Sequence, residues 1–142
     1  MILKSDRLAT LLTEGKDENN PDPLVITPSP RNMQELADSG AGSIDLRLGT
    51  WFVTLRQARM PCLDIDKPGG HSKLTKMHFV PFGEEYYLHP RNFVLAITLE
   101  WMRLPRNLAA YVTGKSSWGR RGLVIATATG VHPGYKGCLS WS

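Results

Sequence analysis

The sequence predicts a mainly β protein with one short helix at its N-terminus. Short apolar stretches rich in β-branched and aromatic residues follow one another, and Gly and Pro turns separate them at fairly even intervals. Apolar and polar residues alternate from Ile44 to Leu48, as in a half-buried strand. Helical segments do not alternate with these strands, so a parallel α/β sheet is not supported. We therefore expect a β-barrel or a β-sandwich.

The helix is expected at the start of the chain. Ser5 is predicted to be its N-cap, and Gly15 is predicted to end it. Between them, Leu8, Leu11 and Leu12 recur at helical spacing. The next segment, Lys16 to Gly42, is rich in Pro, Asn, Asp, Ser and Gly and predicts a loop, with one short strand at Leu24 to Thr27.

The rest of the chain is predicted to be β. Gly49 is expected to end the strand at Ile44 to Leu48, and Lys67 to Lys76 is expected to be a mobile loop. Phe93 to Leu99 is apolar on both faces and predicts a fully buried strand. Further strands are expected at Trp51–Leu55, Phe79–Phe82, Glu85–Leu88, Ala109–Thr113 and Leu123–Ala128.

Length and composition indicate one ordinary globular domain. The chain has 142 residues, of which 42% are hydrophobic and 21% charged. No apolar run is long enough to span a bilayer and no signal-peptide pattern is present, so we expect a cytoplasmic protein. Cys62 and Cys138 lack C-x-x-C spacing and are predicted to be buried or half-buried thiols. The net charge of +4 mildly favours anionic partners without separating a nucleotide from nucleic acid.

One segment, Gly114 to Gly122, has the side chains of an anion site. Ser116 and Ser117 offer hydroxyls, Lys115 and Arg120 offer positive charge, and Arg120 lies one helical turn past Ser116. Free N–H groups of a first helical turn would add donors for phosphate oxygens. The structural alternative is that Ser116 caps a short helix while Arg120 and Arg121 face water. The order of a Walker loop is absent.

A second segment, Thr127 to Gly137, places a tight Pro-Gly turn between two strands. Its alternative interpretation is an ordinary hairpin, with His132 as a hydrogen-bonded turn residue rather than a base. The four histidines show no metal-ligand spacing, and the His-x-Glu and Pro-Cys-x-x-Cys motifs of zinc deaminases are absent. A nucleophile elbow is absent as well.

Taken together and in order, these segments resemble the dCTP deaminases of the trimeric dUTPase superfamily. Three further parts of the chain agree with the same family: Ser43 to Gly49, the opening Leu3 to Gly15, and a central portion made of Tyr87 to Pro90, Ala96 to Glu100 and Leu104-Pro105. The resemblance covers nearly the whole chain. It implies a distorted β-barrel of the dUTPase-like, β-clip type that assembles as a homotrimer with active sites between subunits.

The resemblance also implies the chemistry. The family deaminates dCTP to dUTP and ammonia, with Mg²⁺ bound through the triphosphate and without zinc. No nucleic-acid or membrane partner is expected. By position, Ser116 and Arg120 would be catalytic and would position the water and the ring. The nucleotide-binding residues would be Lys115, Ser116, Ser117, Trp118, Gly119, Arg120, Ala128 and His132.

Two departures from the family pattern stand out. His132 replaces an Asp that helps to hold the deoxyribose. The general-base Glu of the family is absent, because Ser142 occupies its position. We therefore expect a single domain, residues 1–142, that lacks the C-terminal strands and tail of the family and is impaired as an enzyme. The alternatives are a non-catalytic nucleotide-binding or interaction module and a dUTPase-like diphosphatase.

Overall fold

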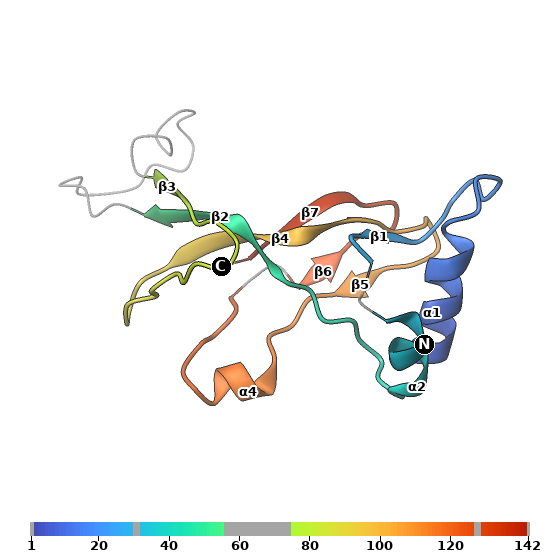
Figure 1. Ribbon diagram of the computed structural model, residues 1–142, viewed down its shortest axis with the longest axis horizontal. Coiled ribbons are helices and arrows are strands. Elements are labelled where there is room, and N and C mark those ends of the chain that lie inside the picture. Colours follow the sequence, from blue (N-terminus) through green and yellow to red (C-terminus); the bar gives the residue numbers. More distant parts are fainter. Residues whose placement is uncertain (1, 30–31, 56–74, 127–128, 142) are drawn as a thin grey trace.

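The computed structural model describes residues 2–29, 32–55, 75–126 and 129–141 (Figure 1). The described part is mainly β, as predicted. The helices are α1 (Ser5–Glu14), α2 (Met33–Asp38) and α4 (Ser116–Gly119). The strands are β1 (Val25–Thr27), β2 (Leu48–Leu55), β3 (Thr75–Phe79), β4 (Val94–Arg103), β5 (Ala110–Tyr111), β6 (Gly130–Val131) and β7 (Lys136–Trp141).

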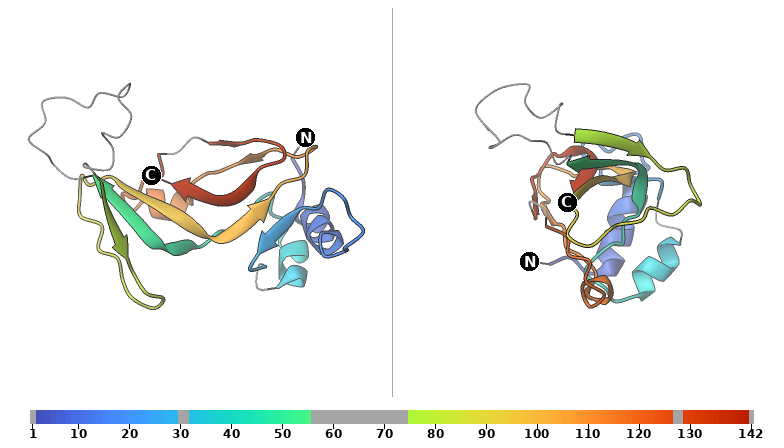
Figure 2. Two further views of the ribbon diagram at one scale, coloured as in Figure 1. Left: turned by 90° about the horizontal axis from the view of Figure 1, so that it is seen from above. Right: turned by 90° about the vertical axis from the view of Figure 1, so that its left-hand side faces the viewer.

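Strand β4 is the centre of a five-stranded antiparallel sheet (Figure 2). One edge of β4 pairs with β2 along its first half and with β1 along its second half. The other edge pairs with β7. Strand β3 extends the sheet beyond β2, while β5 and β6 form a separate pair. The long strands curl, so that the sheet forms a half-barrel (Figure 2).

An irregularity in the middle of β4 bends this sheet. The register with β2 shifts between Leu48 and Phe52 of β2, and the register with β7 shifts between Ile97 and Trp101 of β4. Buried side chains replace the lost ladder bonds. The Thr98 hydroxyl accepts the Leu139 N–H at 2.9 Å, and the Glu100 carboxylate accepts the Arg47 N–H at 2.9 Å. These replacements keep the buried backbone groups paired at the bend.

Helix α1 confirms the predicted N-terminal helix but not its cap. Lys4 is the N-cap, and Ser5 is the first helical residue, with its hydroxyl donating to the Ala37 carbonyl at 3.0 Å. That bond joins α1 to α2, which the sequence interpretation missed inside its expected loop. Asn32 caps α2 by accepting the N–H groups of Gln34 and Glu35. Gly15 ends α1 as predicted, and a Cβ there would collide with the Leu24 carbonyl oxygen.

Several strand predictions were wrong. Residues 44–47 are outside any strand because the Glu100 side chain, rather than a strand, binds the Arg47 N–H. Gly49 lies inside β2, where a Cβ would approach the Ile97 carbonyl oxygen to 3.1 Å. Residues 80–93 hold no strand, so the strand predicted at Glu85–Leu88 is absent. Of the strand predicted at Phe79–Phe82, only Phe79 lies in a strand, as the last residue of β3. Residues 123–126 are also outside any strand, and 127–128 lie outside the described residues.

Three further predictions, for one strand, one loop and the cysteines, are confirmed in part, corrected, or lie in part outside the described residues. The prediction of a strand at Phe93–Leu99 is confirmed by β4, but its residues alternate in burial and Ile97 is exposed. Of the expected loop Lys67–Lys76, residues 67–74 lie outside the described residues, whereas Thr75 and Lys76 begin β3. Cys138 is exposed rather than buried or half-buried, whereas the next residue of β7, Leu139, is buried. Cys62 lies outside the described residues.

The main core lies where the helices pack on one end of the sheet. Leucines of α1 and the adjoining loop meet apolar side chains of β1, β4, β6 and β7, and the buried cluster is Leu12, Leu24, Ile26, Met102, Leu104, Val131 and Leu139. At the other end, Phe52 is buried under Tyr86, with the ring centroids 4.4 Å apart and nearly parallel. The opposite face there exposes Trp51, Leu55 and Phe79.

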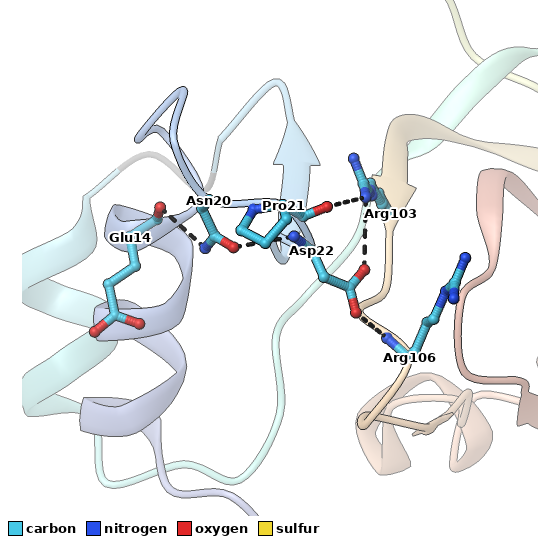
Figure 3. A network of polar contacts seen from close by, with 6 residues as sticks. All are labelled: Glu14, Asn20, Pro21, Asp22, Arg103 and Arg106. Carbon is cyan, nitrogen blue, oxygen red and sulfur yellow. Dashed lines mark hydrogen bonds and ion pairs between the residues drawn. The ribbon is translucent and has the colours of Figure 1, made fainter.

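A polar network ties the loop after α1 to the end of β4 (Figure 3). The Arg103 guanidinium donates to the Pro21 carbonyl at 3.0 Å and lies 3.5 Å from the Asp22 carboxylate. The other oxygen of Asp22 accepts the Arg106 N–H at 2.7 Å. Asn20 in turn accepts the Asp22 N–H at 3.1 Å. The end of β4 is thus fixed just before the chain turns into β5.

Candidate functional site

The predicted Pro-Gly turn forms one side of a pocket of about 240 Å³. The Tyr135 N–H donates to the His132 carbonyl at 3.2 Å, and Gly134 has the positive φ of 77° that such a turn requires. The turn is not an ordinary hairpin, because β6 pairs with β5 and β7 pairs with β4. The Leu104 N–H donates to the Tyr135 carbonyl at 2.9 Å, which holds the turn to the end of β4.

The pocket has an apolar floor and a polar rim. Val131 and Leu139 are buried, whereas His132 and Ser140 are exposed. The Tyr135 hydroxyl donates to the Cys138 carbonyl at 2.7 Å, which fixes the ring beside the pocket. The lining residues are Val112, Gly130, Val131, His132, Tyr135, Leu139 and Ser140. An apolar floor with polar groups at its rim is a lining that small-molecule sites commonly have.

The predicted anion segment forms α4 and the turn after it. Lys115 is the N-cap, Ser116 is the first helical residue, and the Arg120 N–H donates to the Ser116 carbonyl at 3.0 Å. The suggestion that Ser116 caps this helix was therefore wrong. Every residue from 113 to 124 is exposed, and Figure 1 shows α4 standing apart from the sheet. Side chains there are accessible to a ligand in solution.

The cations of this segment have different surroundings. The Lys115 ammonium lies 2.6 Å from the Asp45 carboxylate, and the Arg121 guanidinium lies over the Trp118 ring, 5.4 Å from its centroid. Arg120 is exposed. The sequence interpretation missed Asp45 as a neighbour of this segment. Its only signal was an outward-facing position in the alternating stretch, which does not indicate its partner.

The pocket and α4, the two predicted parts of the site, share no described lining residue in one chain. None of the described residues that line the pocket comes from α4. Ala128 and Ser142, two further predicted positions, lie outside the described residues. Among the residues that the structure describes, no group of three or more His, Cys, Asp or Glu side chains could hold a metal ion.

Comparison with known proteins identifies the family. The family model described as dCTP deaminase-like matches residues 3–141, which is nearly the whole chain. The chain belongs to the dCTP deaminase-like family. The curled antiparallel sheet with its short N-terminal helix is consistent with the dUTPase-like fold expected for this family.

Relatives from archaea and bacteria support the same family assignment. A dCTP deaminase of Halorubrum lacusprofundi is 39% identical over 99% of this chain and 64% of its own length. A protein of Methanobrevibacter smithii named dCTP deaminase, dUMP-forming, is 34% identical over 98% of this chain and 66% of its own. A dCTP deaminase of Shewanella oneidensis is 34% identical over 80% of this chain and 61% of its own. The chain thus spans just under two thirds of the length of these curated relatives.

In the described part of this family member, none of the helices is long and apolar enough to cross a membrane.

Proposed function

We propose that this chain is the nucleotide-binding part of a dCTP deaminase. In the proposed reaction, water adds to C4 of the cytosine ring and the 4-amino group leaves as ammonia, so that dCTP becomes dUTP. The observation that carries the proposal is the dCTP deaminase-like family match over residues 3–141. The names of the relatives from Halorubrum lacusprofundi and Shewanella oneidensis support the same activity.

The pocket and the α4 segment would bind different parts of the nucleotide. The pocket beside His132 and Tyr135 would take the nucleoside, because its floor is apolar and its rim is polar. The exposed α4 segment would take the triphosphate through charge-assisted hydrogen bonds. Its proposed ligands are Lys115, Ser116, Ser117, Trp118, Gly119 and Arg120. Ser116 and Arg120 would also position the attacking water, and Ala128 would contribute backbone contacts near the base.

A homotrimer would unite these parts. Because the described lining of the pocket includes no residue of α4, we propose that α4 serves the pocket of a neighbouring subunit. The apolar face of Trp51, Leu55 and Phe79 is exposed in one chain and offers surface of the kind that subunit contacts bury. Light scattering after size exclusion should then report three times the 15.8 kDa chain mass. A monomer would contradict this assembly.

Magnesium, rather than zinc, is the proposed metal. It would enter bound to the triphosphate oxygens and offset their charge. The proposal predicts that nucleotide binding weakens when magnesium is withheld and is unchanged by a zinc-selective chelator. The cytoplasmic location and the absence of nucleic-acid and membrane partners stay predictions.

Ser142 determines what we expect of the chemistry. It stands where the family has the Glu that takes a proton from water, and a serine hydroxyl is not a base at neutral pH. We predict that these 142 residues release ammonia from dCTP slowly or not at all. We expect Ser142→Glu to raise the rate by about 10²–10⁴-fold, the usual contribution of a positioned general base. Ammonia release measured beside a Ser142→Gln control tests this prediction, and equal rates for both variants would contradict it.

Binding is tested separately from chemistry. Isothermal titration with dCTP, dUTP and dTTP in magnesium, on protein shown to be folded by circular dichroism, should detect dCTP. If none of the three binds, the proposed function is wrong. Binding without ammonia release, even by Ser142→Glu, would instead favour a non-catalytic nucleotide-binding module.

A second product is also a candidate. The relatives from Methanobrevibacter smithii and Halobacterium salinarum are named dUMP-forming. If this chain follows them, water would also cleave the triphosphate and release diphosphate, an activity that the dUTPase-like alternative shares. Chromatography of the nucleotide products separates dUMP from dUTP.

A further inference from the structure

An ion pair joins the α4 segment to a part of the chain that is remote in sequence. The Lys115 Nζ lies 2.6 Å from Asp45 Oδ2. Lys115 immediately precedes α4, which stands apart from the sheet and is exposed throughout (Figure 1). Asp45 lies in the extended segment that leads into β2. The pair therefore connects an exposed loop to the entry of a sheet strand.

The segment around Asp45 is itself firmly attached. Two residues later, the Arg47 N–H and Nε donate to the two oxygens of Glu100, at 2.9 and 2.7 Å. The Arg47 carbonyl accepts the Leu99 N–H at 2.9 Å. Glu100 is only 3% exposed and belongs to the central strand β4. The Lys115 ammonium, which Asp45 binds, is therefore held near the buried contact between Arg47 and Glu100.

Lys115 can bind Asp45 and an anion at once. Its ammonium group has three N–H donors, so contact with one carboxylate oxygen leaves two for phosphate oxygens. We propose that Asp45 is a positioning residue: through Lys115 it tethers the α4 loop to the sheet and so raises the affinity of this loop for a polyphosphate. This inference rests on the anion-binding role of α4 in the proposed function.

The size of the effect follows from the exposure of the pair. The two side chains are 55% and 69% exposed, and such pairs shift an equilibrium by up to about fivefold. Asp45→Asn should weaken binding of inorganic tripolyphosphate about two- to fivefold in titrations without added metal. It should also speed tryptic cleavage after Arg120 and Arg121 about two- to fivefold, because local opening exposes these bonds. Mass spectrometry identifies the cleaved bonds.

Two further variants separate tethering from other effects. Glu18→Gln removes the same charge from an exposed position in the turn after α1 and should behave as the wild type. The exchange Asp45→Lys with Lys115→Asp re-forms the pair in reverse and should restore slow cleavage. Thermal unfolding midpoints of all variants should agree closely, since the pair is exposed.

Each outcome has a distinct meaning. If Asp45→Asn binds tripolyphosphate as tightly as the wild type, or more tightly, Asp45 is not a positioning residue. If wild-type protein does not bind tripolyphosphate, the anion-binding role of α4 fails. In that case the rate of tryptic cleavage after Arg120 and Arg121 still tests whether Asp45 tethers the α4 loop. Faster cleavage of Asp45→Asn than of the wild type supports the tether, and equal rates overturn it.

Discussion

Single residues of the α4 segment differ in what they are free to do. Lys115 has a carboxylate partner and Arg121 lies over an aromatic ring, whereas Arg120 is exposed one helical turn past Ser116. Arg120 is therefore the arginine of this segment best placed to meet a ligand without giving up another contact. The spacing from Ser116 and the family resemblance point to the same residue, whose role stays a prediction.

Arg120→Ala tests this assignment. A charged hydrogen bond contributes about 1.5–3 kcal/mol, so dCTP binding should weaken about 10- to 150-fold. The free energy of unfolding should change by less than about 0.5 kcal/mol, as for most surface substitutions. Titration with dCTP and urea denaturation measure the two quantities. Arg121→Ala serves as the matched control, and equal losses of affinity in both variants would contradict a specific role for Arg120.

The residue type of His132 does not by itself show whether it serves the turn or the candidate site. His132 is one of the residues that line the pocket, and its backbone carbonyl accepts the Tyr135 N–H, which shapes the turn. The turn therefore does not require the imidazole ring. The structure confirms His132 as a hydrogen-bonded turn residue through its backbone, and its role in nucleotide binding stays a prediction.

At the scale of elements, the bend in β4 organises the sheet. Thr98 and Glu100 are both buried, and each accepts a backbone N–H from a neighbouring segment. The Thr98 hydroxyl also donates to the Glu100 carbonyl at 2.7 Å. Strand β7, which contributes Leu139 to the pocket, is held in place by this bend.

Thr98→Val should therefore be costly although it preserves shape. It removes the acceptor for the Leu139 N–H and leaves a buried donor unpaired, which costs about 1–3 kcal/mol. Urea denaturation measures the loss in the free energy of unfolding. Thr98→Ser keeps the hydroxyl and should lose clearly less. A Thr98→Val protein as stable as Thr98→Ser would show that the hydroxyl is not what stabilises the bend.

The failed strand prediction at Ile44 to Leu48 has a physical reason. Alternation reports which side chains face the core, and Ile44 and Leu46 are indeed half-buried. It does not report the hydrogen-bond partner, which for the Arg47 N–H is a carboxylate from β4. Helix α2 escaped notice for a similar reason. Its six residues are too few to show periodicity, and it is held by Asn32 and by packing of Met33 and Leu36.

On the scale of the whole molecule, the main core continues into the candidate pocket, because Val131 and Leu139 belong to both. The helices and the main core cover one end of the sheet, and the candidate pocket opens near the β5–β6 pair. The network of Figure 3 joins these regions, because Asp22 from the loop after α1 binds both Arg103 and the Arg106 N–H. Asp22 thus links the N-terminal packing to the turn that leads to the pocket.

Asp22→Asn should weaken this link. It removes the ion pair with Arg103 and leaves a poorer acceptor for the Arg106 N–H. Because both side chains are partly exposed, we expect a loss of about 1 kcal/mol in the free energy of unfolding. Urea denaturation beside Glu18→Gln, which removes an exposed charge outside the network, measures this loss. Equal stability of the two variants would contradict a linking role for Asp22.

The fold class, the N-terminal helix, the family and the residue types of both candidate segments could be predicted from the chain alone. These are local properties or ordered motifs, which the chain carries without being folded. Tertiary structure alone decided that Glu100 replaces a strand partner, that Asp45 meets Lys115, and that the pocket contains no α4 residue. Each of these depends on contacts between segments remote in sequence, and neither periodicity nor spacing encodes which remote segment folds against which.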